Sequence, residues 1–316
     1  MSTIPRIDED AGRILENLKK ANLPPFESLT PVQSRARMRA MREAMKQPVP
    51  DMAEVRDVIA SGPHGPIPAR LYRSKSAGAG PAPVLMFYHG GGWVVGDLDT
   101  HDNQARFFAD SMNGVVVSVD YRLAPEHKFP AAADDCFAAT TWVAANAAGL
   151  NIDAGRLAVG GDSAGGNLAA VVALMAAEKA APNVRAQVLI YPAVDLRMGY
   201  ASYKSVGDGY TLTRGSMEWF RDHYLNTPAE VNDWRASPML AKNHAAAPPA
   251  YLVTGGLDPL SDETAAYADV LRKAGVEAQF HYCPGQMHGF VGAKGIIKQA
   301  DMVIDEIGAF LKVKLR

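Results

Sequence analysis

The sequence predicts an α/β fold in which a mainly parallel, eight-stranded sheet is flanked by helices. Three observations lead to this prediction. Short apolar runs typical of buried strands alternate along the chain with longer segments rich in helix formers. Several of these runs are continuously apolar, which is the pattern of parallel strands covered on both faces. Glycine-rich turns follow two of the runs directly, at residues 90–92 and 160–166, where a strand is expected to pass sharply into a loop or a helix.

The N-terminal part of the chain comes before this alternation. Residues 8–22 and 31–46 are predicted to be helical, because apolar positions recur three to four residues apart. The second of these helices carries a stripe of methionines, Met38, Met41 and Met45. Packing against the body of the protein is the simplest interpretation of the stripe, although methionine also suits an adaptable apolar binding wall.

The core elements are then expected in a regular order. Strands are predicted at 54–60, 67–72, 84–88, 114–120, 156–159, 187–191, 251–256 and 278–283. Helices are predicted from about 102, at 131–147, directly after Ser163, and at 213–225, 262–274 and 296–311. The stretch 195–240 breaks the rhythm, because it is polar, aromatic and rich in glycine. We interpret this stretch as an insertion that lies over the loop edge of the sheet.

The composition narrows the class of protein. A formal net charge of −2 over 316 residues argues against electrostatic binding of nucleic acid, and no apolar run approaches the about 18 residues of a membrane span. The segment from Met1 to Asp10 is acidic and polar, unlike a signal peptide. Cys136 and Cys283 have neither metal-ligand nor redox spacing. We therefore expect a soluble cytoplasmic protein with reduced thiols, no metal or cofactor, and no nucleic-acid or membrane partner.

A serine lies at the junction between a predicted strand and a predicted helix. It is Ser163, in the sequence Gly161-Asp162-Ser163-Ala164-Gly165. A G-x-S-x-G turn of this kind lifts the serine hydroxyl clear of the sheet, and the helix that follows adds free backbone N–H groups beside it. The alternative is an ordinary glycine-rich turn. The strand before and the helix after favour a nucleophilic serine.

A serine hydroxyl needs a neighbouring base, and the positions of the eight histidines discriminate among them. His288 lies in a loop directly after the last predicted strand, whereas His281 lies inside that strand. Parallel strands bring their carboxyl ends to one edge of a sheet, so His288 is our candidate base. Asp258, after the preceding strand, is our candidate for the acid that orients the base. Asp195, at the end of another strand, is the competing candidate.

Three glycines follow another buried strand, in the sequence His89-Gly90-Gly91-Gly92-Trp93. Successive glycines are conformationally costly, which indicates that the backbone approaches something closely there. We expect the N–H groups of Gly90 and Gly91 to point inward at a developing oxyanion. A flexible loop is the alternative, but it does not account for the flanking histidine and tryptophan. The acidic stretch 97–102 superficially offers metal ligands, yet Asp and Thr beside a predicted helix are ordinary N-caps.

Together these motifs resemble those of the hormone-sensitive-lipase family of α/β-hydrolases, the bacterial family IV esterases. The similarity extends from about residue 54 to the C-terminus and lies in five segments, His89–Trp93, Tyr121–Pro130, Gly161–Gly166, Asp258–Leu260 and His288–Phe290. It implies an α/β-hydrolase fold with Ser163 as nucleophile, His288 as base and Asp258 as acid.

The resemblance also implies oxyanion-hole donors at Gly90, Gly91 and Ala164, a helical cap, and often a dimer. The corresponding division of the chain is an N-terminal helical cap segment at 1–50 and a cap insertion at 195–240. The core is then formed in two parts, 51–194 and 241–316.

The activity implied by the resemblance is hydrolysis of short- to medium-chain carboxylic esters, small molecules, through an acyl-enzyme. Three alternatives remain open. A true lipase is expected to have an apolar, mobile lid, whereas residues 195–240 are polar and charged. An amidase or peptidase could use the same three side chains. A ligand-binding receptor on a retired scaffold, similar to the plant gibberellin receptors of this family, would lack the histidine that this chain has at position 288.

Overall fold

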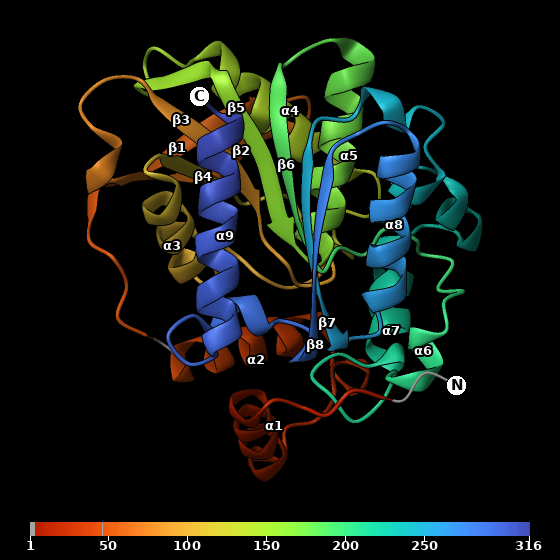
Figure 1. Cartoon of the computed structure of the whole chain (residues 1–316). Helices are drawn as coiled ribbons and strands as arrows, with labels where there is room; N and C mark the ends of the chain where they lie inside the picture. Colours follow the sequence, from red (N-terminus) through yellow and green to blue (C-terminus); the bar gives the residue numbers. More distant parts are fainter. Residues whose placement is uncertain (1–3, 46) are drawn as a thin grey trace.

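One eight-stranded sheet forms the centre of the structure, a computed structural model that describes residues 4–45 and 47–316 (Figure 1). The strands lie side by side in the order β1-β2-β4-β3-β5-β6-β7-β8. β1 pairs with β2, and β2 with β4, in antiparallel register, while the five other pairs are parallel. The predicted α/β fold with a mainly parallel, eight-stranded sheet is therefore confirmed.

The strands occur where they were predicted, with longer ends in places. They are β1 Met52–Gly62, β2 Gly65–Ser74, β3 Ala82–Tyr88, β4 Val115–Val119, β5 Ile152–Asp162, β6 Val184–Ile190, β7 Ala250–Leu257 and β8 Ala278–Met287. In β4 every residue is buried, because helices cover both faces of the sheet there. The main differences are at β5, which begins before the predicted residue 156, and at β8, which continues to the residue before His288.

The helices also follow the predicted order. They are α1 Glu9–Ala21, α2 Pro31–Ala44, α3 Asp102–Met112, α4 Ala131–Ala145, α5 Ala164–Lys179, α6 Ser202–Ser205, α7 Arg214–Tyr224, α8 Ser261–Lys273 and α9 Lys298–Lys314. Short 3₁₀ segments lie at Phe26–Ser28, Lys75–Ala77, Pro228–Asn232, Pro238–Leu240, His244–Ala246 and Phe290–Ala293. The four-residue helix α6 was not predicted. Residues 1–3 of the predicted cap segment and Lys46, predicted to end the second helix, lie outside the described residues.

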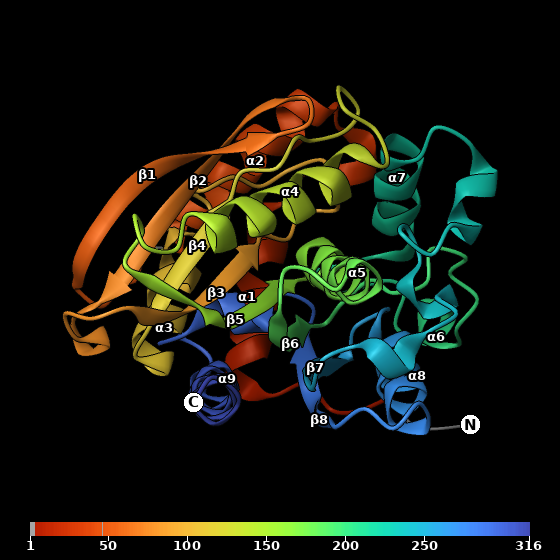
Figure 2. The ribbon, with the colours of Figure 1, turned by 90° about the horizontal axis from the view of Figure 1, so that it is seen from above.

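Two layers of helices enclose the sheet. α3 and α9 pack on one face, and α4, α5 and α8 pack on the other (Figure 2). α5 is apolar on all sides and every residue from Ala164 to Ala176 is buried, as expected of a helix packed within the core. Among the described residues, no helix has both the length and the apolar content needed to cross a bilayer.

Helices α1, α2, α6 and α7 lie beyond the end of the sheet toward which the parallel strands run (Figure 1). α2 begins with a capping box between Thr30 and Gln33, with a proline at its first position. Arg35 attaches this helix to the core, because its guanidinium donates to the carbonyls of Val94 and Ala124 and pairs with Glu126 at 2.6 Å. The chain thus places two distant segments over one edge of the sheet.

Candidate active site

Ser163 lies on the sharp turn that joins β5 to α5. Its backbone has φ 57° and ψ −118°, a conformation that residues other than glycine adopt rarely, and it is stabilised by the strand and helix on either side. Glycine is needed on both sides of the turn, because a Cβ atom at Gly161 or Gly165 would overlap the carbonyl oxygen of Tyr88. The local sequence therefore fits a turn that exposes one hydroxyl at the end of the sheet.

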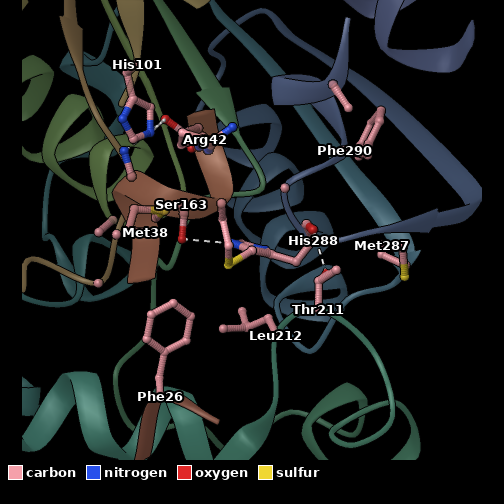
Figure 3. Close-up of a pocket in the computed structure, with 18 of the residues that line it drawn as sticks. Phe26, Met38, Arg42, His101, Ser163, Thr211, Leu212, Met287, His288 and Phe290 are labelled. Carbon is pink, nitrogen blue, oxygen red and sulfur yellow. Dashed lines mark hydrogen bonds and ion pairs between the residues drawn. The ribbon is translucent and has the colours of Figure 1, made fainter. Parts of the chain in front are cut away.

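His288 and Asp258 meet Ser163 at this edge. The Ser163 Oγ lies 2.9 Å from Nε2 of His288, and Nδ1 of His288 lies 2.7 Å from Oδ2 of Asp258 (Figure 3). Asp258 is fully buried, and its Oδ1 accepts the N–H of Leu260 at 2.9 Å, so its carboxylate is held in one orientation. The competing candidate, Asp195, instead pairs with an arginine two residues along the chain at 2.7 Å.

This arrangement forms a continuous chain of hydrogen bonds from the serine to the carboxylate. A neutral imidazole with its hydrogen on Nδ1 can accept the hydroxyl proton at Nε2, while the buried carboxylate stabilises the resulting positive charge. The three side chains that the sequence analysis selected from different ends of the chain are therefore within hydrogen-bond distance of one another.

The glycine loop after β3 differs from its prediction in one position. The N–H of Gly90 donates to Oδ1 of Asp162 at 2.9 Å, so it is already engaged and cannot serve an oxyanion. The assignment of Gly90 as an oxyanion donor is therefore corrected. No described group accepts a hydrogen bond from the N–H of Gly91, Gly92 or Ala164, and all three residues line one cavity with the serine.

Glycine is required at the next two positions of the loop. Gly91 has φ 123° and Gly92 has φ 58°, in the range that favours glycine. A Cβ on Gly91 would overlap the backbone of Val95, and one on Gly92 would overlap the ring of Phe220. The backbone of the loop does approach other groups closely, as predicted. Some of those groups belong to the protein itself, namely Val95 and Phe220.

Asp162, whose role was not predicted from the sequence, anchors this loop. Burial opposes its ionisation, but the neighbouring His101 and Arg42 and the N–H of Gly90 hold its pKa below the usual range. Nε2 of His101 lies 3.7 Å from its Oδ1. The carboxylate therefore keeps a charge that fixes the Gly90 amide. The only signal in the sequence was an acidic residue immediately before the serine.

His89 supports the loop from below rather than entering the cavity. Its ring is stacked on Tyr121 with centroids 4.3 Å apart, and the Tyr121 hydroxyl donates to the His89 carbonyl at 2.7 Å. Burial, together with the neighbouring His101, lowers the pKa of His89 to about 4. His89 is therefore neutral near pH 7 and serves as a packing residue.

A cavity of about 160 Å³ opens over Ser163 (Figure 3). Its walls are mostly apolar and come from α1, α2, the 195–240 stretch and the core, including Ile14, Leu18, Phe26, Leu212, Met217, Phe220, Met287, Phe290 and Ile297. Met38, Met41 and Met45 of α2 also line it. The methionine stripe thus faces the cavity, and the predicted packing against the body of the protein is confirmed for Met38 and Met45, which contact the buried core. An adaptable binding wall stays a prediction.

The 195–240 stretch is attached to the loop that carries the candidate base and to α8. The hydroxyl of Thr211 donates to the His288 carbonyl at 2.7 Å (Figure 3). At the start of the stretch, the buried Glu263 of α8 accepts the N–H groups of Val194 and Asp195 and the hydroxyl of Tyr203. Burial raises the pKa of Glu263 well above its usual range.

The acidic stretch 97–102 is engaged within the protein. Asp97 and Thr100 exchange hydrogen bonds of 2.8 Å across a turn, and Asp102 accepts from Tyr72 and Arg106. α3 begins at Asp102, as predicted. In the part of the chain that the structure describes, no group of three or more His, Cys, Asp or Glu side chains is arranged to hold a metal ion.

Comparison with known proteins relates this geometry to a family of enzymes. Residues 85–292 match the family described as α/β hydrolase fold. The carboxylic ester hydrolase LipN of Mycobacterium tuberculosis is 44% identical over 266 residues, which are 82% of this chain and 70% of LipN. An arylesterase of Saccharolobus solfataricus is 33% identical over 97% of this chain and 98% of its own length.

Solved structures show the same similarity along almost the whole chain. An ester hydrolase from the metagenome of Lake Arreo has a TM-score of 0.93 and 38% identity, over 97% of this chain and 98% of that one. A thermostable esterase from Pseudomonas putida has a TM-score of 0.94 and 35% identity, over 100% of this chain and 99% of that one.

Proposed function

Because this chain belongs to the hormone-sensitive-lipase type of the α/β-hydrolase family and is a carboxylic ester hydrolase, we propose that it cleaves esters through an acyl-enzyme on Ser163. The observation that carries the proposal is the path from the Ser163 hydroxyl through His288 to the buried Asp258, with contacts of 2.9 and 2.7 Å. The N–H groups of Gly91, Gly92 and Ala164, which donate to no described group and belong to residues lining the same cavity as Ser163, add to it.

Acylation begins when the Ser163 Oγ attacks the ester carbonyl carbon and passes its proton to Nε2 of His288. The carbonyl oxygen becomes negatively charged in the tetrahedral intermediate. In this proposal the N–H groups of Gly91, Gly92 and Ala164 donate to that oxygen, each such donor contributing about 10²- to 10³-fold in rate. His288 then gives its proton to the departing alcohol, and the acyl group stays on Ser163.

Deacylation repeats these steps with water as the nucleophile. Neutral His288 takes a proton from water, the hydroxide adds to the acyl carbon, and the imidazolium returns the proton to Ser163 Oγ as the acid leaves. Asp258 remains ionised throughout and keeps the hydrogen of His288 on Nδ1. The net reaction consumes one ester and one water and yields one acid and one alcohol.

The cavity bears on the choice of substrate. Its volume of about 160 Å³ and its apolar walls fit a small acyl or alcohol group, in agreement with the proposed short- to medium-chain esters. Residues 1–50 and 195–240 act in this proposal as a cap, because α1, α2 and the side chains of Leu212 and Phe220 form the outer walls.

The test is a series of p-nitrophenyl esters from acetate to palmitate, assayed with the wild type and Ser163→Ala. By analogy with a serine protease, we expect the variant to lose about 10⁶-fold in kcat. Ser118→Ala is a matched control, because Ser118 is buried in β4 and its hydroxyl has no hydrogen-bond partner among the described residues. Near-normal turnover by Ser163→Ala would refute the proposal. Preferential cleavage of emulsified triolein or of p-nitroanilides would indicate a lipase or an amidase instead.

A further inference from the structure

One guanidinium lies against the cavity that is otherwise lined mainly by apolar groups. Among the described residues that line it, Arg42 is the single lysine or arginine. It lies on α2, and in Figure 3 it is on the side of Ser163 where His101 is drawn, away from Phe26. Its Nη1 lies so close to Gly292 that a Cβ there would come within 2.7 Å of it. Arg42 is therefore held at one end of the cavity by packing.

The other arginines of α2 have hydrogen-bonded partners, whereas Arg42 has none among the described residues. Arg35 pairs with Glu126, Arg39 pairs with Asp97, and Arg37 donates to the carbonyl of Pro24. Within residues 4–45 and 47–316, no group forms a hydrogen bond or an ion pair with the Arg42 guanidinium. A guanidinium carries five N–H donors, and no Arg42 nitrogen is among the fully buried unpaired atoms of the described residues, so these donors are accessible to solvent or to a group in the cavity.

The nearby carboxylate does not satisfy Arg42. Arg42 influences Asp162 through its field, contributing to the lowered pKa of that carboxyl. Oδ1 of Asp162 accepts the Gly90 N–H, and Nε2 of His101 lies 3.7 Å from the same oxygen. The donors of Arg42 thus remain available to a group that enters the cavity.

We infer that Arg42 forms an anion subsite, and that the enzyme accepts esters that carry a carboxylate, namely half-esters of dicarboxylic acids. This inference rests on the proposed function of Ser163. A planar carboxylate can take two parallel N–H bonds from a guanidinium, which a point charge cannot provide. Without that pairing, a carboxylate would be excluded by the apolar walls. Hydrolysis consumes one water and releases the alcohol, the dicarboxylate and one proton.

Turnover tests the inference with esters matched in carbon number. Monomethyl succinate, glutarate, adipate and suberate are compared with methyl butyrate, pentanoate, hexanoate and octanoate by pH-stat titration. In the wild type we expect the ratio of kcat/KM for the charged to the neutral ester to peak at one chain length. Arg42→Met should lower the ratio at that length about 10- to 100-fold, the effect of losing a charged hydrogen-bonded pair. Arg42→Lys should retain part of the preference for the charged ester, because lysine keeps the positive charge but lacks the planar, two-pronged guanidinium.

The control for this comparison is Arg39→Met. Arg39 lies on the same helix but is 67% exposed and pairs with Asp97, so its removal should leave the ratio unchanged. Added salt should reduce the wild-type ratio, because screening weakens the attraction. An unchanged ratio in Arg42→Met at every chain length would overturn the inference. An equal loss for charged and neutral esters would also overturn it, because Arg42 would then act only through Asp162.

A binding measurement separates this inference from the proposed function. We expect Ser163→Ala to bind monomethyl adipate more tightly than methyl hexanoate in calorimetry, and the added Arg42→Met change to remove that preference. If the preference is seen while the wild type cleaves no ester, the subsite stands and the catalytic proposal fails. If the wild type cleaves neutral esters but calorimetry with each of the four ester pairs shows no such preference, the subsite fails and the catalytic proposal stands.

Discussion

Replacing Asp258 by asparagine tests how the candidate base is oriented. Oδ1 of Asp258 accepts the Leu260 N–H, and Oδ2 faces Nδ1 of His288 at 2.7 Å. In Asp258→Asn the amide oxygen can keep the bond to Leu260, which turns the NH₂ group toward His288. Nδ1 must then accept, so the ring hydrogen moves to Nε2. In that tautomer His288 cannot take the proton of Ser163.

The size of the effect follows from the lost charge and the wrong tautomer. A carboxylate about 4 Å from the imidazolium charge contributes about 4 kcal/mol at an effective dielectric constant of about 20, which corresponds to about 10³-fold in rate. The unfavourable tautomer adds to this, as in serine proteases, where the same change costs about 10⁴-fold in kcat. We therefore expect Asp258→Asn to lower kcat by about 10³- to 10⁴-fold.

The assay is kcat for a short p-nitrophenyl ester, with circular dichroism to confirm folding. Asp195→Asn is the matched control, because Asp195 also follows a strand but pairs with a half-exposed arginine instead of the histidine. We expect it to keep kcat within about twofold, because the buried Asp195 carboxylate is bonded to Arg197 and not to the histidine. If Asp258→Asn retains more than about a tenth of the wild-type kcat, or if both variants lose equally, the reasoning is wrong.

Two further predictions concern the glycine loop and the start of the 195–240 stretch. Gly92→Ala would place a methyl group against the Phe220 ring at φ 58°, so we expect a loss of about 100-fold or more in kcat/KM; normal turnover would show that the loop holds no oxyanion donor. Glu263 has a raised folded-state pKa, so its contribution to stability is complete below the unfolded value of about 4.3 and declines as the pH rises toward the folded value. Glutamine does not titrate, so the free energy of unfolding of Glu263→Gln, measured in urea, should rise relative to that of the wild type as the pH is raised from 5 to 8. If the two proteins show parallel pH profiles, this prediction is wrong.

The sheet and the position of its reactive edge could be predicted because each depends on local pattern. Continuous apolar runs such as Val84–Tyr88 become strands buried on both faces, and the chain leaves each parallel strand at the same edge. Ser163, Asp258 and His288 each directly follow a parallel strand, so their approach to one another is a consequence of topology.

Details that depend on how segments dock could not be predicted in this way. Nothing in the glycine motif distinguishes Gly90 from Gly92 as a donor, because the difference lies in the Asp162 carboxylate, which reaches back from another strand. Likewise, the direction in which Met38 and Arg42 point depends on how α2 sits on the core. The contacts of Arg35 with carbonyls about 60 and 90 residues away determine that placement. Contacts between residues so far apart in the sequence leave no periodic pattern from which they could be predicted.

The hydrogen bond from Thr211 to the His288 carbonyl has a practical consequence for enzyme engineering. Residues 195–240 are an obvious target for mutant libraries, since Leu212 and Phe220 shape the cavity. Thr211 lies within the same segment and directly contacts the backbone of the catalytic-base candidate. Libraries that randomise position 211 will therefore mix changes of selectivity with displacement of the imidazole, whereas libraries that keep Thr211 allow substrate preference to be redesigned separately from turnover.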